Sequence, residues 1–496
     1  MANGVVANPT YMADIRFFFR AVDIQHMGGI GIDLSTYDGV KQNATTIYFH
    51  TAPPNADMPP DAAGKWSADR SQTFKNWIVN GMPLGTATTP PGGGPGTTPG
   101  YGGPEATPDR VRKNLTTLSA QEIDTLKTAF TGLMNRDPDQ PDSYFVIAGV
   151  HGRPGRACLH HEPRFNPWHR VYMKVFEDAL RSVPGCENVT MPYWDFMTPL
   201  PDVLGEGPFG SYKLPQNVPG IPPNYTTDRN DAATITQNLQ DFGVPFQLQT
   251  SLQQSTWGEF NVGGYQKWSI QVHDNGHVSI GPTMADQDVA SYDPVFWFFH
   301  CNIDRLWLSW QTLVGATTLQ GFKSTLTGDT TWLDPPFNVL PPYSVPPYST
   351  TADETIAYGI GYDKLVTVEE AAPLENKVGS VDATRRFSLK RSSPVSVRLK
   401  NIDRLNIPGS FVVHLLADGQ PVAKNAFFQP STPRECANCV EHGLVNIDFR
   451  LDPEQILDKT LSVEIEVPSR KDIGERFPLS QAGNPTINAR LLLDDE

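Results

Sequence analysis

The chain contains eleven histidines, and six positions in two groups have a spacing that suits metal binding. A neutral imidazole ring is a ligand for copper, zinc, iron or nickel. The first group lies in FVIAGVHGRPGRACLHHEPRFNPWHR, and the second begins in WSIQVHDNGHVSI and ends in DPVFWFFHCNIDRLW. The candidate ligands are His151, one of His160 and His161, His169, His273, His277 and His300.

The second group predicts a three-histidine site built on two helices. His273 and His277 are four residues apart, so on a helix both lie on one face with Cβ atoms about 5–6 Å apart. His300 lies on a separate amphipathic segment, which would face the first helix and supply the third ligand.

The first group predicts another site of the same kind. His169 begins a helix, His151 ends another, and either His160 or His161 comes from the loop between them. An isolated histidine is commonly an ordinary core or surface residue. Two groups of three histidines, each beside helices rich in aromatic residues, favour metal binding over an ordinary core or surface role.

The ligand type limits the choice of metal. Sites with three histidines and no carboxylate suit copper, or zinc with an open coordination position. A zinc hydrolase would also need a nearby general base, and the chain contains no His-Glu-x-x-His motif. Spacing alone does not choose between the two metals.

Helices must position these histidines. Ser119 is an expected N-cap, and the residues after it place apolar side chains at helical spacing. Those side chains are Ile123, Leu126, Phe130 and Leu133. Further helices are expected at 142–150, directly after 168–170, and at 295–313. Helices around histidines indicate a bundle that holds metal between facing helices, so the predicted fold class is mainly α.

The chain divides into regions of different composition. Residues 1–83 include a helix predicted at 68–80 with Ser67 as its N-cap, and they form a small helical domain. Residues 84–108 are dominated by Gly, Pro and Thr, which is typical of a flexible linker. Residues 109–365 contain all the candidate ligands and form the helical core.

The C-terminal region has a different pattern. After a second linker at 366–383, the residues alternate or run β-branched in RRFSLKR, VSVRLKN, SFVVHLLA, LVNIDFRL and LSVEIEV. Short strands of this kind predict a β-sandwich domain at 384–496.

Composition excludes some classes of protein. The net charge is -15, which argues against a nucleic-acid partner, because phosphate binding needs clustered Lys and Arg. No apolar run reaches about 18 residues, so no membrane partner is expected. The start MANGVVANPT lacks the features of a signal peptide, which predicts a cytoplasmic protein. Five unevenly spaced cysteines are too few for a disulfide scaffold.

Two motifs in the core resemble those of a known family. His160-x8-His169-Arg170, with its Phe, Pro and Trp, is similar to the first copper motif of tyrosinases and polyphenol oxidases, the type 3 dicopper proteins. Residues 293–307, DPVFWFFHCNIDRLW, are similar to their second copper motif. The resemblance covers about 109–365 and implies a helical-bundle core that binds two copper ions.

The resemblance assigns the ligands. It implies His151, His160 and His169 for copper A, and His273, His277 and His300 for copper B. The nine-residue step to His169 selects His160, which leaves His161 as a neighbouring residue without a ligand role.

The fungal-like tyrosinases provide the closest parallel to the flanking features. Their Cys-x-His sequence corresponds to Cys158-Leu159-His160 here and implies a thioether between Cys158 and the ring of His160. A buried free thiol is the alternative. Their C-terminal β-sandwich caps the copper site and carries a CxxC motif linked to copper loading, which corresponds to Cys436 and Cys439.

The same relatives fill the substrate pocket with a phenylalanine about nine residues before the CxxC motif. That position is Phe427 here, with Phe428 beside it, so this pair is the expected plug of the pocket. Val278, directly after His277, is expected to line the pocket and influence which phenols fit. Arg112 and Tyr362 resemble landmarks that meet at the end of the core domain.

Two positions depart from the family pattern. Phe299 replaces the first residue of a common His-His pair at the last ligand. Many tyrosinases have Glu shortly before the first copper-B ligand and Asn after it, which together order a water that helps to deprotonate a monophenol. Gln271 and Asp274 are the corresponding residues here, and of these only Asp274 could act as a base. Asp304 and backbone carbonyls are candidates to fix the tautomers of the ligands.

The resemblance implies a copper enzyme that oxidises phenols with O2. Its partners would be O2 and a small phenol, which it would hydroxylate at the ortho position and oxidise to an o-quinone. Two alternatives remain open: a catechol or aminophenol oxidase that does not act on monophenols, and an O2-binding protein similar to hemocyanin. The sequence makes no prediction of the oligomeric state or of the physiological phenol.

Overall fold

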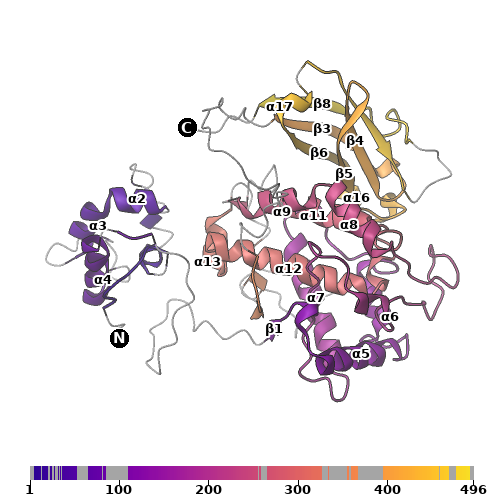
Figure 1. Ribbon diagram of the computed structural model, residues 1–496, viewed down its shortest axis with the longest axis horizontal. Helices are drawn as coiled ribbons and strands as arrows, with labels where there is room; N and C mark the ends of the chain where they lie inside the picture. The colour runs from indigo at the N-terminus through magenta and orange to yellow at the C-terminus, as the bar shows by residue number, and fades with distance from the viewer. Residues whose placement is uncertain are drawn as a thin grey trace, which may run out of the picture. The chain divides into compact units, whose positions relative to one another are not determined.

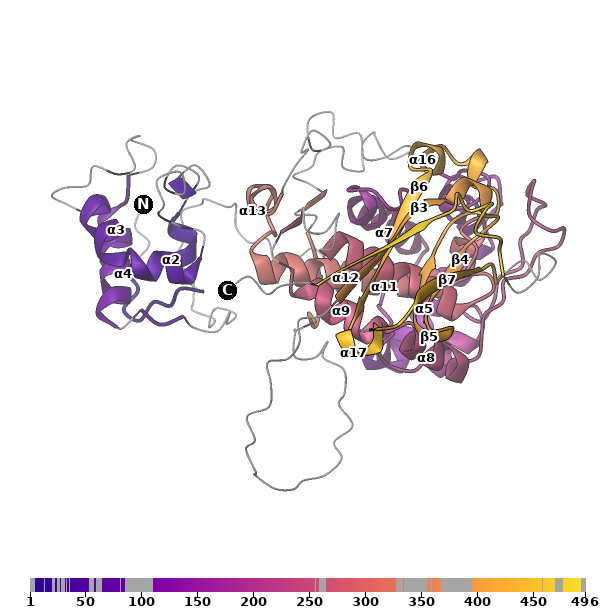
Figure 2. The ribbon, with the colours of Figure 1, turned by 90° about the horizontal axis from the view of Figure 1, so that it is seen from above.

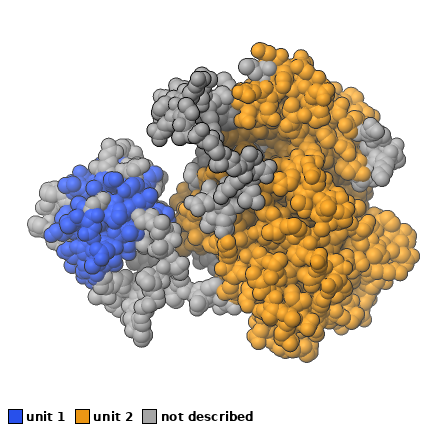
Figure 3. Space-filling model, viewed as in Figure 1, with its two compact units in different colours: residues 1–107 blue, residues 108–496 orange. Residues whose placement is uncertain are grey.

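The structure is a computed structural model, and it divides the chain into two compact units, 1–107 and 108–496 (Figure 3). It describes residues 5–12, 14–19, 23–24, 27, 32, 34, 36–52, 58, 65–80, 82–84, 110–254, 256–257, 265–326, 333, 355–356, 359–366, 395–456, 458–468 and 476–491. The linkers predicted at 84–108 and 366–383 therefore lie almost entirely outside the described residues. The predicted core and the predicted β-sandwich belong to one unit.

The first unit is helical. Its elements are η1 (Ile15–Phe18), α2 (Tyr37–Gln42), α3 (Ala44–Thr51) and α4 (Ala68–Val79). The helix predicted at 68–80 is confirmed, and the Ser67 side chain accepts a hydrogen bond from the backbone N–H of Arg70. Phe74 and Trp77 project from α4 into a buried cluster of aromatic and aliphatic side chains.

The second unit contains the helical core, which confirms the predicted fold class (Figure 1). Its longer helices are α5 (Ala120–Met134), α6 (Tyr144–His151), α7 (Phe165–Arg181), α8 (Ala232–Asp241), α9 (Val244–Leu252), α11 (Tyr265–Ile280), α12 (Val295–Val314) and α13 (Leu319–Ser324). Short 3-10 helices are η2 (Leu115–Thr117), η3 (Asp202–Gly205) and η4 (Ala290–Tyr292).

Local sequence explains where these helices begin. Ser119 is the N-cap of α5, as the sequence predicts, and it forms a reciprocal capping box with Glu122. Ser143 caps α6, whose last residue is His151. The helices pack through aromatic side chains, and the rings of Phe176 on α7 and Trp297 on α12 stack 3.6 Å apart. This packing fixes α7 against α12, so that ligands on the two helices keep a constant separation.

The C-terminal residues form two three-stranded antiparallel sheets, seen edge-on in Figure 2, which confirms the predicted β domain. Strands β3 (Val395–Asp403), β6 (Leu444–Leu451) and β8 (Thr486–Leu491) form one sheet in the order β6-β3-β8. Strands β4 (Phe411–Ala417), β5 (Gln420–Phe427) and β7 (Leu461–Glu466) form the other in the order β5-β4-β7. The short helices η6 (Arg404–Asn406), η7 (Pro433–Glu435), α16 (Ala437–Glu441) and α17 (Pro453–Ile456) lie between strands.

The β domain and the helical core share a boundary formed by β5 and α11 (Figure 1). The alternation of apolar residues explains the orientation of the sheets, because β3 buries every second side chain at its start. The strand predicted in RRFSLKR lies outside the described residues. In the part of the chain that the structure describes, no helix is both long enough and apolar enough to cross a membrane.

A buried network of charged side chains links three segments of the core. Strands β1 (Arg110–Arg112) and β2 (Ile360–Tyr362) pair in parallel, and Arg112 Nη1 lies 3.1 Å from the hydroxyl oxygen of Tyr362. The expected meeting of Arg112 with Tyr362 is therefore confirmed. Arg112 also contacts Glu177 at 3.3 Å and Asp304 at 3.2 Å, and all three side chains are almost completely buried. Each buried charge thus has an opposite charge beside it.

Glu177 makes this network sensitive to acid. Burial alone would raise the pKa of Glu177, but Arg112 and Arg110 outweigh burial and hold that pKa below its ordinary value. A lowered pKa in the folded state contributes stability above the unfolded value of about 4.3, and this contribution is lost as the pH falls through the folded value. We expect Glu177→Gln to lower the free energy of unfolding by about 3 kcal/mol at neutral pH.

Urea unfolding followed by tryptophan fluorescence between neutral and acidic pH tests this prediction. The difference in the free energy of unfolding between the original chain and Glu177→Gln should shrink as the pH falls. A difference that stays constant down to the lowest pH would show that the ionisation of Glu177 does not stabilise the fold.

Candidate metal centre

The six predicted ligands come from four helices and one loop, and all are buried. His151 ends α6, His169 lies in the first turns of α7, and His300 lies in α12. His273 and His277 occupy one face of α11, and His160 lies in the loop before α7. None of the six is more than 3% exposed. The structure therefore brings together every ligand predicted from the sequence.

The ring nitrogens lie close enough to share metal ions. One nitrogen atom each from His151, His160 and His169 lie within 4.8 Å of one another, as the predicted copper-A set requires. A second group within the same limit consists of His169, His273 and His300. His277 joins this second group, because its Nε2 atom lies 3.1 Å from Nε2 of His300. His169 belongs to both groups, so the two sites adjoin.

Backbone and side-chain acceptors fix the tautomers of three ligands. Nδ1 of His169 donates to the carbonyl of Phe165 at 2.8 Å, and Nδ1 of His277 donates to the carbonyl of Met284 at 2.8 Å. These bonds place the hydrogen on Nδ1 and leave a lone pair on Nε2, which can bind a metal. The expected role of backbone carbonyls is therefore confirmed.

The expected role of Asp304 is wrong. Asp304 lies one helical turn after His300, but its carboxylate accepts hydrogen bonds from Arg170 at 2.6 Å, Arg112 at 3.2 Å and the Tyr362 hydroxyl at 2.6 Å. On a helix a step of four residues points both side chains to a similar side, but three buried donors behind α12 draw the carboxylate away from the histidines. Asp274 is the carboxylate that contacts a ligand, since it accepts from Nδ1 of His273 at 2.8 Å.

Burial keeps the histidines neutral. It lowers the pKa of His169 and of His277 to about 3, and the pKa values of the other four ligands also lie well below their ordinary value. A neutral imidazole keeps the lone pair that a metal needs, whereas an imidazolium ion has none.

The residues present fit a pair of copper ions. Within the described chain, the Nε2 atoms of His169 and His273 and both ring nitrogens of His151 and His160 are buried without a hydrogen-bond partner. Buried polar atoms without partners are costly to the fold, so their convergence indicates that an ion completes them. Both groups consist of histidine alone, a ligand set that suits copper and also zinc.

Phe428 lies against the histidine cluster, and Phe427 does not. The ring of Phe428 stacks on the ring of His277 at 4.0 Å, and it meets the rings of His160 and His273 edge to face at 5.5 Å each. The ring of Phe427 instead stacks on His161 at 4.0 Å. Of the two predicted plug residues, Phe428 is the one whose ring occupies the space beside the ligands.

Asp274 connects the cluster to the β domain. Besides its bond to His273, it accepts a hydrogen bond at 3.1 Å from the backbone N–H of Phe428. Burial raises the pKa of Asp274 well above its ordinary value, although the bond from Phe428 acts in the opposite direction. Both carboxylate oxygens are engaged in this closed arrangement, and the role of Asp274 as a base stays a prediction.

Gln271 contacts the β domain instead of the ligands. Its side-chain amide donates to the backbone carbonyl of Asp448 on β6 at 3.2 Å. The carboxamide cannot act as a base in any case. Gln271 therefore holds the β domain against α11, and a catalytic role for it finds no support in its contacts.

Phe299, which replaces the expected histidine, packs against the ligand helix. Its ring lies 5.0 Å from the ring of His277, and it fills the space beside Gly276. A Cβ atom at Gly276 would lie only 2.6 Å from the ring of Phe299, so a glycine is required there. Val278 is half-buried at the edge of the core, and its predicted influence on phenol selection stays a prediction.

Three of the five cysteines lie in or beside the loop that carries His160. Cys158 is a buried free thiol, and burial raises its pKa to about 12. Cys436 and Cys439 form a disulfide bond, and between them Asn438 donates a hydrogen bond at 2.9 Å to the carbonyl of His160. The CxxC motif thus lies beside a copper-A ligand, which is compatible with its predicted role in copper loading.

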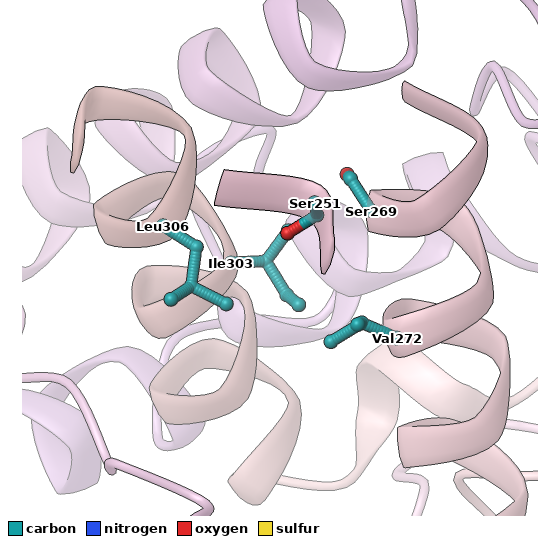
Figure 4. Close-up of a pocket in the computed structure, with 5 residues that line it drawn as sticks. All are labelled: Ser251, Ser269, Val272, Ile303 and Leu306. Atoms are coloured by element: carbon teal, nitrogen blue, oxygen red, sulfur yellow. The ribbon is translucent and has the colours of Figure 1, made fainter. Parts of the chain in front are cut away.

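The narrow gap drawn in Figure 4 lies where α9, α11 and α12 meet. It is lined by Ser251, Ser269, Val272, Ile303 and Leu306. It has no room for a water molecule and includes none of the six ligands. A phenol therefore cannot bind there, and the space beside His277 is the better candidate.

Sequence reasoning missed the contacts that fasten the β domain to the core, and it did not name Asn275 at all. Asn275, between two ligands on α11, accepts a hydrogen bond from the backbone N–H of Ala426 at 2.7 Å. The signal was present, because Asp274 and Asn275 are polar residues within a buried helix. Their partners lie about 150 residues later in the chain, so only the folded structure identifies them.

Comparisons with known proteins agree with this site. The family profile described as "Common central domain of tyrosinase" matches residues 141–217 and 203–313. A tyrosinase from Streptomyces lincolnensis is 30% identical over 242 residues, which are 40% of this chain and 82% of that protein. Unit D of the hemocyanin beta-C chain from Helix pomatia is 31% identical over 237 residues, which are 41% of this chain and 52% of that protein.

A solved structure shows the same fold. The tyrosinase from Burkholderia thailandensis superposes with a TM-score of 0.56 at 18% identity, covering 77% of this chain and all of that one. The chain belongs to the tyrosinase family of type 3 copper proteins. It spans only about half the length of the hemocyanin unit, and hemocyanins stand beside tyrosinases among its relatives, so the family alone does not decide between catalysis and O2 binding.

The ligand set predicts the copper content. We expect His277→Ala to lower the copper bound per chain from about two ions to about one, since the second site would keep only two neutral imidazoles. Metal analysis by mass spectrometry after copper loading and desalting measures this content. His442→Ala, which changes a half-buried histidine of the β domain, is the matched control. Unchanged copper in His277→Ala, or zinc in its place, would contradict the assignment.

The thioether makes a separate prediction. If Cys158 bonds to a ring carbon of His160, the thiol and the ring each lose one hydrogen atom, and O2 would be the oxidant that takes up the two electrons and two protons, with copper supplying the redox chemistry when bound. Peptide mapping should then find a cross-linked fragment that lacks two hydrogens after copper loading in air. Cys158→Ser should prevent the link, and an unlinked peptide from the fully copper-loaded chain would rule the thioether out.

Proposed function

We propose that this protein oxidises phenols with O2 at a dicopper centre formed by the six buried histidines. The observation that carries the proposal is the ring of Phe428, which stacks 4.0 Å from His277 among the ligands. A planar aromatic ring therefore has a place against the metal ligands, and a phenol needs such a place to reach the copper ions.

The reaction balances with O2 alone. A monophenol and one O2 give an o-quinone and one water, whereas two o-diphenols and one O2 give two o-quinones and two waters. The two copper ions, when bound, would supply the exchange of electrons between O2 and the phenol. The chain itself buries the six imidazoles, fixes the tautomers of three of them, excludes water and stacks the aromatic ring.

In the closed arrangement Phe428 acts as a plug, so we propose that the chain is latent until the β domain moves. The plug is held by a group of ionic and polar contacts that we call the clamp. On the core side the clamp consists of Arg153, Arg156 and Asp288, and on the β-domain side of Ser431, Thr432 and Glu435.

The clamp is extensive for a surface contact. Arg153 donates to Thr432 Oγ1 at 2.9 Å and to Glu435 at 2.8 Å. Arg156 contacts the same two residues and also makes a paired contact with Asp288 at 2.7 and 2.8 Å. Because Glu435 is largely exposed, salt and water weaken its part of the clamp. The clamp is therefore strong enough to favour closure and weak enough to open.

Two other functions have a supporting observation. An O2 carrier similar to hemocyanin would use the same ligands, and the buried Phe428 would keep phenols out permanently. An oxidase limited to o-diphenols is favoured by the engagement of both Asp274 oxygens, because no carboxylate of the cluster is then free to deprotonate a monophenol.

Oxygen uptake by the copper-loaded chain distinguishes these functions. We expect the original chain to consume O2 slowly with L-tyrosine and L-DOPA, and Thr432→Val/Glu435→Gln to consume it severalfold faster with both. The double substitution removes the ion pairs of both arginines with Glu435 and their hydrogen bonds to the Thr432 hydroxyl, and it changes no ligand. Higher salt should stimulate the original chain more than the variant.

Glu464→Gln is the matched control, since Glu464 forms an exposed ion pair with Arg476 within the β domain. It should not change O2 uptake. Uptake with L-DOPA alone would indicate an o-diphenol oxidase. No uptake with either phenol, in the clamp variant and in mild detergent, would leave an O2 carrier as the remaining function.

A further inference from the structure

Phe428 is bound to the core through its backbone as well as its ring. Strand β5 ends at Phe427, whose partner on β4 is Phe411, so Phe428 is the first residue beyond the sheet. Its backbone N–H donates to Oδ2 of Asp274 at 3.1 Å. Its carbonyl oxygen lies 3.3 Å from Nε2 of His161, which is in place to donate. Ring, N–H and carbonyl are thus all recognised by side chains of the core.

The core holds the side chain of Asp274 directly, and it carries the backbone of His161. Asp274 is part of α11, and its other oxygen accepts from Nδ1 of His273, which limits its rotation. His161 follows the ligand His160 directly, and its backbone adopts the left-handed conformation with φ of 59°, which turns its ring away from that of His160. The two ring centres are 6.3 Å apart. The ring of His161 also stacks on Phe427 of the β domain at 4.0 Å. Both residues belong to the core and stay beside the ligands when the β domain withdraws, but the ring of His161 then loses this stacking contact.

This arrangement is a complete binding site for one aromatic amino-acid residue. Resting on the function proposed above, we propose that the site selects tyrosyl units that carry an α-amide N–H and a carbonyl, as in a peptide, over simple phenols. Asp274 accepts the N–H of the substrate, His161 donates to its carbonyl, and the phenol ring takes the position of the Phe428 ring on His277. Asp274 and His161 are then residues that determine specificity.

The positions of the two hydrogen-bond partners distinguish an L-residue from a D-residue. Phe428 is an L-residue, and its N–H and carbonyl point to two different partners while its ring stays on His277. A D-residue with its ring in the same place would exchange the positions of these two groups. The carbonyl would then face the carboxylate of Asp274, and two acceptors do not form a hydrogen bond. The site should therefore prefer the L-enantiomer.

The alternative interpretation is that these bonds only dock the β domain. In that case a soluble phenol would gain nothing from Asp274 and His161. Simple phenols, amides of L-tyrosine and amides of D-tyrosine would then be oxidised according to ring access alone. The two interpretations differ in their dependence on substrate, which can be measured.

The test uses the whole copper-loaded chain with the substitutions Thr432→Val and Glu435→Gln. The weakened clamp should let the β domain move, which exposes the position that the Phe428 ring occupies. Oxygen uptake gives kcat and KM for N-acetyl-L-tyrosine amide, N-acetyl-D-tyrosine amide and 4-ethylphenol. We expect kcat/KM for the L-amide to exceed the other two by about tenfold, since two hydrogen bonds each add a modest net amount. The difference should lie mainly in KM, because the bonds are formed before oxidation as well as during it.

The same measurement with His161→Phe added tests the residue. Phenylalanine keeps a flat ring at this position but removes the N–H that the carbonyl would accept. The ratio of kcat/KM between the L-amide and the D-amide should then fall toward one. This ratio is an internal control, because any general damage to the copper site affects both enantiomers alike.

The outcomes separate the two proposals. A tenfold preference for the L-amide that His161→Phe removes supports the inference. Equal kcat/KM values for all three phenols, or a preference that survives His161→Phe, overturn the inference and leave the proposed phenol oxidation intact. The absence of O2 uptake with every phenol, in this variant and in mild detergent, overturns the proposed function and the inference together.

Discussion

Six imidazole rings face one another in a space from which water is excluded, and the rest of the structure follows from keeping them neutral there. A buried imidazole ring needs an acceptor for its N–H and a partner for its lone pair. The carbonyl of Phe165 serves His169 one helical turn away, and the carbonyl of Met284 serves His277 from the segment after α11. The lone pairs then point inward, where metal ions can satisfy them. Four helices must hold this arrangement rigidly.

The charges of the core are separated from the ligands along the same helix. His300 and Asp304 lie one turn apart on α12, yet one faces the cluster and the other faces Arg112 and Arg170. An ionised carboxylate among the ligands would attract protons to the imidazole rings and compete for the metal. The buried ion network therefore anchors α12 and keeps one negative charge away from the site. Fold stability and ligand geometry thus depend on one element.

The sequence predicts the elements of the site but not their contacts. Spacing predicts five of the six ligands, because His273 and His277 are local partners on one helix and the flanking aromatic residues mark the others. It leaves His160 and His161 open, and the resemblance to the copper motifs makes that choice. It leaves the choice between Phe427 and Phe428 open, since neighbouring residues at a strand end face opposite sides and only the docked sheet shows which side meets the core. It misplaces Asp304, because the arginines that attract its carboxylate come from distant segments. The partners of Asp274 are likewise non-local.

If the β domain caps the site as proposed, it both protects and blocks the site, and bound copper would change the balance between these effects. Without metal, the inward nitrogens of His151 and His160 are buried without partners, so closure carries a desolvation cost that water could relieve in an open state. Bound copper satisfies the same nitrogens and removes that cost, so closure becomes more favourable once the site is loaded. A loaded chain should then hold Phe428 more firmly than an empty one. No residue of the clamp is itself a ligand, so we expect that opening can be controlled at the clamp without loss of the metal.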